Sequence, residues 1–264
     1  MIMDCSLHHK SIIINHFCLD TWEYLILFLS VLFGGGLAFY FKKNNKEVLQ
    51  MTLSFSGAYI LGISVLHLMP VAFSTGEHST GLYLLGGFFV QLLLERLSQG
   101  VEHGHIHAPH TGKTAFAIQI MIGLCIHAFF EGLPLGGYDD LHAAHHHDHG
   151  EHHLLFGIVL HKAPAAFALV LLFLVSGIQK NIILICLLVF ASMSPLGAGV
   201  AEYLSSNQLL STKMQVNIIS FVIGSFLHIA TTILFEMDNS GHHGLSIQKL
   251  IVIAIGMSLA ILTI

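Results

Sequence analysis

Charged side chains are scarce in this sequence. Only 9% of its 264 residues are Asp, Glu, Lys or Arg, whereas 54% are hydrophobic, and the mean hydropathy is +0.76. A soluble domain usually carries about 25% charged residues. The composition therefore excludes an ordinary soluble domain and favours a chain that lies within a lipid bilayer.

The sequence also lacks a basic cluster and a paired-cysteine motif. Its formal net charge is −5, and its ten Lys and Arg residues are scattered, which argues against a nucleic-acid partner. The four cysteines form no CxxC pair. Cys125 and Cys186 lie in apolar runs and are expected to be packing residues. Cys5 and Cys18 could form a disulfide in an oxidising compartment, but their spacing leaves this open.

Histidine is the residue in excess, with 21 copies against ten Lys and Arg together. Histidine enrichment in short tracts indicates metal binding. A purification tag is the alternative, but these tracts are internal and irregular. No cleavable signal peptide is expected, because the first apolar stretch, Ile12–Ile14, is short and polar residues follow it.

Eight apolar stretches are long enough to cross a membrane, which takes about 20 mostly apolar residues. We expect helices at about Trp22–Phe41, Val48–Phe73, Gly81–Leu97, Thr114–Gly137, Leu154–Ser176, Asn181–Leu204, Met214–Phe235 and Ser246–Ile264. No run of residues is left over for a soluble domain. The sequence therefore predicts an all-α, polytopic membrane protein in which residues 1–264 form a single transmembrane transporter domain.

The basic residues of the connections predict the orientation, because cytoplasmic loops carry more Lys and Arg. One set of connections and their flanks holds Lys42, Lys43, Lys46, Arg96, Lys113, Lys180 and Lys249, whereas the opposite set holds only Lys10 and Lys213. The first set is therefore expected in the cytoplasm. With eight helices, both termini then lie outside.

This orientation separates two histidine-rich loops. The predicted cytoplasmic loop, about 99–113, contains His103, His105, His107 and His110, and the predicted outer loop, about 138–153, contains His142, His145, His146, His147, His149, His152 and His153. The outer loop also holds four acidic residues and no Lys or Arg. Such a loop would attract cations and bind them weakly. The alternative is a merely solvated loop.

Ionisable residues inside the expected fourth helix are candidate metal ligands. A charged side chain at a helix centre costs about 2.5–3.5 kcal/mol on the insertion scale, so a functional role is the default interpretation. His127 and Glu131 are four residues apart and lie on one helical face. An imidazole and a carboxylate at this spacing can chelate one ion. The alternative is a buried His–Glu hydrogen bond that holds two helices together.

His161 in the expected fifth helix is the predicted third ligand. Lys162 follows it and points about 100° away around the helix. Lys162 could neutralise a neighbouring carboxylate, such as Glu131, and take the space of a second cation. Alternatively, Lys162 extends to the outer interface, because it lies close to the helix start.

Five further polar residues could line a metal route. They are His67, Ser194, Glu202, His228 and Glu236. Each of them taken singly is more often an interfacial residue or part of a helix–helix hydrogen bond.

These segments resemble the ZIP metal transporters. The matching segments are His67–Pro70, His127–Gly136, His161–Leu169, Ser194–Gly197, and Phe226–His228 followed by Glu236. The His161-Lys162 pair is similar to the branch that includes the plasma-membrane zinc importers of animals. The five segments occur in the family's order and cover nearly the whole membrane portion.

The resemblance implies import of Zn²⁺ or a related divalent ion toward the cytoplasm, with a site between the fourth and fifth helices. His127, Glu131 and His161 fall on its metal-binding positions, and a block of helices is implied to move against a scaffold. Two positions depart from the family pattern. Ala128 stands where many members have Asn, Asp or Ser, and Ala165 stands where many have Glu. With Lys162 nearby, a single-metal site is expected.

Several points stay open in the sequence. A mixed imidazole–carboxylate site suits Zn²⁺, and also Fe²⁺, Mn²⁺, Co²⁺ or Cd²⁺. The expected location is the plasma membrane, and a homodimer is one open assembly. The chain is not expected to be an enzyme. The alternatives are a metal-dependent intramembrane hydrolase, although no HExxH motif occurs, a proton-coupled exporter, and a sensor that binds metal without transporting it.

Overall fold

A computed structural model describes residues 5–40, 46–75, 79–104, 113–137, 151–236 and 246–263 of the chain. The elements in these residues are helical. The long helices are α1 (Cys5–Leu37), α2 (Lys46–Ile63), α4 (Thr80–Ser98), α5 (Lys113–Gly132), α7 (Glu151–Val175), α8 (Lys180–Ser206), α9 (Thr212–Glu236) and α10 (Ile247–Leu262). Shorter pieces are η1 (Ser64–Leu68), α3 (Met69–Thr75), η2 (Val101–His103) and η3 (Leu133–Gly137).

The predicted all-α membrane architecture is confirmed. Six spans in the described part of the chain are long and apolar enough to cross a membrane, and they extend over 47–74, 80–98, 113–136, 153–175, 180–206 and 212–235. Two shorter apolar helices, Thr21–Leu37 and Ile247–Leu262, occupy the first and last predicted positions. Helix α1 begins earlier than predicted, at Cys5, because no Gly or Pro precedes Gly34 in this stretch to interrupt it.

Two of the predicted helices change their winding where proline occurs. The second predicted helix continues through a π-helical turn, Ser64–Leu68, immediately before Met69 and Pro70. Proline lacks an N–H and its ring collides with the carbonyl four residues earlier, which here is in that turn. The fourth predicted helix ends as α-helix at Gly132 and finishes as the 3₁₀ turn η3, which contains Pro134. His67 lies in the π turn, and Glu131 lies directly before the 3₁₀ turn.

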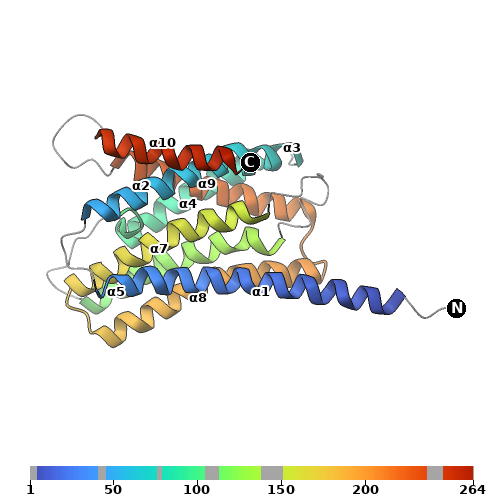
Figure 1. Ribbon diagram of the computed structural model, residues 1–264, viewed down its shortest axis with the longest axis horizontal. Coiled ribbons are helices and arrows are strands. Elements are labelled where there is room, and N and C mark those ends of the chain that lie inside the picture. The colour runs from blue at the N-terminus through green and yellow to red at the C-terminus, as the bar shows by residue number, and fades with distance from the viewer. Residues whose placement is uncertain are drawn as a thin grey trace.

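The helices form two groups, or blocks, with different neighbours. Helix α4 packs along α9, and α2 packs against α10 and α9, which defines block A. Helix α7 packs along α1, and α8 packs against α5 and α1, which defines block B. The blocks meet mainly where α4 lies against α5 and α2 lies against α7. Figure 1 shows the two groups one above the other.

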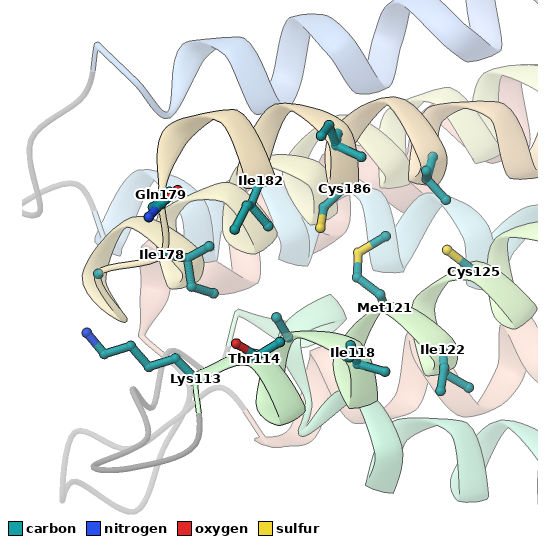
Figure 2. Close-up of a pocket in the computed structure, with 14 residues that line it drawn as sticks. Lys113, Thr114, Ile118, Met121, Ile122, Cys125, Ile178, Gln179, Ile182 and Cys186 are labelled. Atoms are coloured by element: carbon teal, nitrogen blue, oxygen red, sulfur yellow. The ribbon is translucent and has the colours of Figure 1, made fainter.

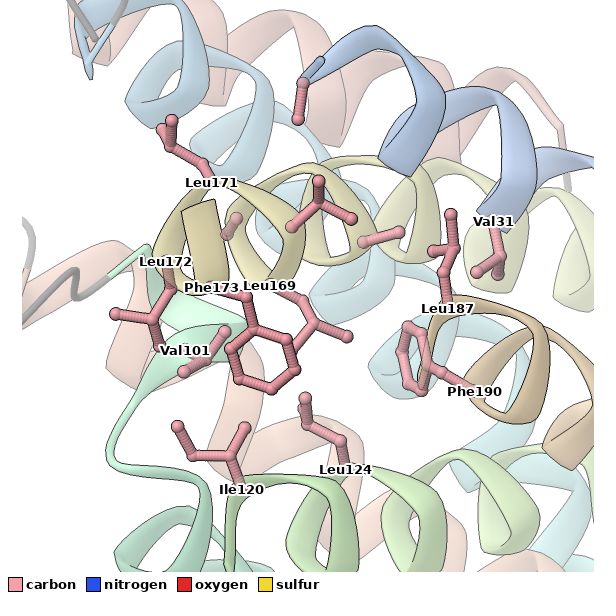
Figure 3. Close-up of a cluster of buried hydrophobic side chains, with 14 of the residues drawn as sticks. Val31, Val101, Ile120, Leu124, Leu169, Leu171, Leu172, Phe173, Leu187 and Phe190 are labelled. Carbon is pink, nitrogen blue, oxygen red and sulfur yellow. The ribbon is translucent and has the colours of Figure 1, made fainter. Parts of the chain in front are cut away.

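A cluster of buried aliphatic and aromatic side chains lies mainly in block B and extends to α2 and α9 of block A. Phe173, Leu169 and Leu172 of α7 pack with Ile120 and Leu124 of α5, and Val101 of the η2 turn joins them (Figure 3). Many large apolar side chains on the outside of the helices are exposed, as expected for surfaces that face lipid. The core therefore fixes α5 and α7, the two helices that carry the predicted ligands.

The positions of the helix ends agree with the prediction that alternate connections lie on opposite sides of the membrane. The starts of α2, α5, α8 and α10 lie at one end of the bundle, and α1 begins and α10 ends at the other (Figure 1). Of the basic residues used for the orientation, Lys46, Lys113 and Lys180 begin α2, α5 and α8, and Lys249 lies in the first turn of α10. Which end faces the cytoplasm stays a prediction.

Candidate metal centre

Three side chains converge inside the bundle between α5 and α7. One ligand atom from each of His127, Glu131 and His161 lies within 4.8 Å of the others, and all three residues are buried. His127 Nε2 lies 3.6 Å from Glu131 Oε2. The rings of His127 and His161 meet edge to face, with their centroids 6.2 Å apart. The structure thus brings together the three residues that the sequence singled out as ligands.

The local fold explains this convergence. His127 and Glu131 are one turn apart on α5, on the face that also buries Ile120, Leu124 and Ala128. The opposite face of α5 is more exposed, with Ile118 and Ile122 pointing outward. The metal group therefore lies on the buried face of an otherwise apolar helix.

Lys162 is part of the same buried site. Its Nζ lies 2.9 Å from Glu131 Oε2 and 4.9 Å from the centre of the Phe190 ring. The prediction that Lys162 could neutralise Glu131 is confirmed as a contact. The alternative, that Lys162 extends to the outer interface, is wrong, because its side chain is only 2% exposed. The apolar surroundings make the nearby carboxylate the favourable place for the ammonium group.

Glu102 is a site residue that the sequence analysis missed. Its Oε2 lies 3.9 Å from His127 Nε2, and the residue is 1% exposed. It was assigned to the predicted cytoplasmic loop, about 99–113, but the start of that segment folds back into the bundle. Gln99, Gly100 and Gly104 have positive φ angles of 55°, 69° and 82°, which turn the chain into and out of η2.

The surroundings of Glu102 act on its protonation. Burial first, and then repulsion from Glu131, raise the pKa of its carboxyl from 4.5 to about 8 against the opposing effect of Lys162. The burial of Glu102 had no signal in the sequence, because this residue lies between Gly100 and Gly104 in a histidine-rich segment. Only the return of η2 to the bundle reveals this group.

Gln91 of α4 connects these groups by hydrogen bonds. Its Nε2 donates to Glu102 Oε2 at 3.0 Å, and its Oε1 lies 3.0 Å from His127 Nδ1. Ser225 Oγ of α9 donates to the same Oε1 at 3.0 Å. Gln91 was also missed, although a lone amide within the apolar run 88–94 was a usable signal.

His228, a predicted route residue, lies in a second polar group rather than with the three ligands. Its Nε2 lies 2.5 Å from Glu95 Oε2, and Phe88 contacts its ring. Glu95 is one turn from Gln91 on α4, toward the end of the helix at Ser98. Glu95 was not among the predicted route residues.

The remaining predicted route residues are not members of the three-ligand group. Ser194 Oγ donates to the carbonyl of Ala128 at 2.7 Å, and Tyr24 donates to Glu202. The ring of His67 lies 6.1 Å from that of His153, at the start of α7. Glu236 ends α9, and its side chain is outside the described residues, as are the side chain of His103 and residues His105, His107, His145, His146, His147 and His149.

A separate cavity of about 530 Å³ lies between α5 and α8, and none of the three ligands is among its lining residues. Figure 2 shows Met121, Cys125 and Cys186 lining it beside several isoleucines, with Lys113 and Thr114 at one end. Cys125 and Cys186 are free and partly exposed, in keeping with their expected role as packing residues. The cavity walls lack the convergent polar groups of a metal centre.

Comparison with known proteins identifies the family. The family model described as ZIP zinc transporter matches residues 102–263, which is more than half of the chain. The chain is 32% identical over 170 residues to zinc transporter ZIP9 of Micropogonias undulatus, covering 61% of the chain and 53% of that protein. It is 34% identical over 173 residues to zinc transporter ZIP9-B of Xenopus laevis, covering 61% and 54%.

A more distant relative gives the same result. The chain is 27% identical over 146 residues to human zinc transporter ZIP1, covering 52% of the chain and 43% of that protein. The chain thus spans about half the length of the curated relatives it matches. The matched region contains α5, α7 and their three candidate ligands. The chain therefore belongs to the ZIP zinc transporter family.

Proposed function

We propose that this protein carries divalent metal ions, Zn²⁺ first among them, into the cytoplasm through a single-metal site formed by His127, Glu131 and His161. The observation that carries the proposal is the convergence of these three buried side chains within 4.8 Å in an apolar bundle. The relatives are named as zinc transporters, which makes zinc the first candidate.

The spacing of the ligands supports metal binding. Two ligand atoms about 2.0 Å from one tetrahedral zinc ion lie roughly 3.3 Å apart. The His127–Glu131 separation of 3.6 Å is close to this distance, and His161 has a ligand atom within 4.8 Å of both. The imidazoles bind when they are neutral, and the carboxylate offsets part of the ion's charge in the low-dielectric interior.

A single ion is favoured by the residues around this group. Ala128 and Ala165 are buried and supply no donor atoms. The ammonium group of Lys162 lies on the Glu131 carboxylate and repels a second cation at short range. Because Glu131 is shared between lysine and metal, the ion is held less tightly than in a closed structural site with four ligands. Weaker binding suits a site that must release its ion.

Polar groups on either side of the site suggest a route. His67 and His153 lie at the end of the bundle that is predicted to be outside. Toward the predicted inner end, Glu102 lies beside His127. The Glu95–His228 pair lies in the same direction, because Glu95 is one turn beyond Gln91 on α4. Glu102 is therefore a candidate next contact for an ion that leaves His127.

The packing suggests which parts move. In each block, helices approach so closely that a Cβ atom on certain glycines would collide with a neighbouring backbone oxygen, as at Gly132 against Ser194 and at Gly87 against Phe221. Most such contacts hold helices of one block together, although Gly123 of α5 also lies close to the carbonyl oxygen of Leu94 on α4 of block A. The metal group lies on block B, where α5 meets α4 of block A. We infer that block B moves against block A to open the site inward.

Zinc flux into vesicles tests the proposal. Purified protein is reconstituted with no pH gradient, and uptake is compared across Zn²⁺, Fe²⁺, Mn²⁺, Co²⁺ and Cd²⁺. We expect zinc uptake by the parent, and uptake near background for H127A, E131A and H161A. The exposed variant T114A on the same helix serves as the control and should retain parental uptake.

The outcomes separate the alternatives. If H127A and E131A both transport zinc as well as the parent, the site is wrong. If the parent binds zinc but moves none, the protein is a sensor rather than a transporter. Immunolabelling of intact cells tests the expected location in the plasma membrane.

A further inference from the structure

Both the nitrogen and the oxygen of the Gln91 side-chain amide, in α4, have hydrogen-bond partners. The residue is 1% exposed. Its Nε2 donates to Glu102 Oε2, and its Oε1 faces both Ser225 Oγ and His127 Nδ1, each at 3.0 Å. A buried amide is costly unless it is hydrogen-bonded, so this network holds the side chain in one orientation.

The partners lie on different sides of the amide. In the observed orientation Nε2 faces Glu102 Oε2, and Oε1 faces Ser225 Oγ and His127 Nδ1. With Oε1 facing His127 as a pure acceptor, the proton of the neutral imidazole must be on Nδ1. The other nitrogen, Nε2, then carries the lone pair.

This tautomer is the one that the metal group requires. His127 Nε2 is the atom that faces Glu131 Oε2, at 3.6 Å. A neutral imidazole binds metal only through its unprotonated nitrogen. A histidine with the proton on Nε2 would present an N–H to the ion instead of a lone pair.

We propose that Gln91 is a positioning residue for metal transport, which holds His127 in the Nδ1–H tautomer and aims the Nε2 lone pair at the ion. This inference rests on the proposed function of the His127–Glu131–His161 site. Ser225 and Glu102 keep the amide in place. In metal sites generally, loss of a partner that fixes a ligand's tautomer lowers affinity about 10–100-fold.

The position of Gln91 gives the contact a second consequence. Gln91 and Ser225 belong to the α4–α9 pair of block A, whereas His127 belongs to α5 of block B. The tautomer is therefore fixed while α5 lies against α4. Separation of the two helices releases His127 from this constraint and weakens its hold on the ion.

Zinc binding to the purified full-length protein tests the inference through two variants. Q91M keeps the size of the side chain but removes the acceptor, and its zinc affinity should fall about 10–100-fold. In the exchange variant Q91E/E102Q, the carboxylate at position 91 can accept a hydrogen bond from His127, and the amide at position 102 can donate to that carboxylate. This variant should recover most of the affinity. Q215M, which removes another buried glutamine on α9, is the matched control and should bind zinc as the parent does.

Nitrogen-15 spectra of histidine-labelled protein give a readout that a purely structural role would not change. The His127 signals are identified by their loss in H127A. In the metal-free parent they should show a protonated Nδ1 and an unprotonated Nε2, and in Q91M a mixture of both tautomers.

Three results would distinguish an error in the role of Gln91 from an error in the metal site itself. If H127A loses zinc binding but Q91M binds as the parent does, the role of Gln91 is wrong and the metal site stands. If H127A binds as the parent does, the metal site itself is wrong. If Q91M does not fold, the spectrum of the parent decides, and a proton on Nε2 of His127 overturns the inference.

Discussion

Glu131 and Lys162 show how one buried charge depends on another. Their side chains are almost fully enclosed and 2.9 Å apart, so each neutralises the other where water cannot. Removing one member of such a pair typically costs about 3–5 kcal/mol, because the remaining charge is left uncompensated. The sequence identified both residues, but their contact depends on the packing of α7 against α5.

Replacement of Lys162 tests this dependence. We expect K162M to lower the free energy of unfolding by about 3–5 kcal/mol, because the Glu131 carboxylate stays buried without its cation. The double variant E131Q/K162M should recover most of the loss. Thermal unfolding of the metal-free protein in detergent measures both. Zinc should restore stability to K162M but not to the double variant, and equal stability of K162M and parent would contradict the pairing.

Glu102 should make the stability of the metal-free protein depend on pH. Its pKa is about 8 in the folded protein against an ordinary value of 4.5, chiefly because of burial. Between these two values only the folded chain keeps the proton, so the stabilisation present below pH 4.5 is lost as pH rises toward 8. The variant E102Q should lack this decline. Unfolding midpoints in chelator, taken as the difference between parent and E102Q across pH, isolate the effect from the histidines.

At the scale of elements, helix contacts depend on glycines that allow the backbones to approach. A Cβ atom on Gly197 of α8 would lie 2.1 Å from the carbonyl oxygen of Phe129 on α5, whereas one on Gly199 would meet nothing within 4 Å. Gly197 therefore sets the distance between α8 and the helix that carries His127 and Glu131.

Two alanine substitutions on α8 test this contact. We expect G197A to lower the free energy of unfolding by about 1–3 kcal/mol, since the backbones must move apart. It should also weaken zinc binding by displacing α5. The matched variant G199A should be close to neutral in both measurements. Similar behaviour of the two variants in unfolding and binding experiments would show that α8 does not constrain the site.

The elements themselves were largely predictable from the sequence. Long apolar runs separated by short polar segments place seven of the eight predicted helix starts within a few residues of those observed. The early start of α1 and the π turn before Pro70 were not predicted. Both depend on local helix continuity rather than on hydropathy, which marks only the membrane-length portion of a helix.

At the scale of the whole molecule, the orientation of the helix bundle in the membrane determines the proposed direction of transport. The starts of α2, α5, α8 and α10 share one end of the bundle (Figure 1), and Lys46, Lys113, Lys180 and Lys249 lie in the first turns of these helices. The positive-inside tendency therefore predicts that this end faces the cytoplasm. The acidic, histidine-rich loop 138–153 then faces outward.

Single cysteines introduced in a cysteine-free background test the orientation. Lys113 begins α5 and Lys213 is the second residue of α9, and both are exposed. The two helices start at opposite ends of the bundle (Figure 1). A membrane-impermeant maleimide applied to intact cells should label K213C and should label K113C only after permeabilisation. Labelling of K113C in intact cells, with K213C protected, would reverse the orientation and with it the proposed direction of transport.

The sequence by itself determined the membrane class, the helix positions and the identity of the three candidate ligands. These follow from the high cost of charge in a bilayer and from the four-residue periodicity of a helix. Only the tertiary structure decided which further polar groups join them. Gln91, Glu102 and Ser225 come from three separate elements, and Lys162 could equally have faced the interface. Their places depend on how α4, α7, α9 and η2 pack around α5, which no local pattern encodes.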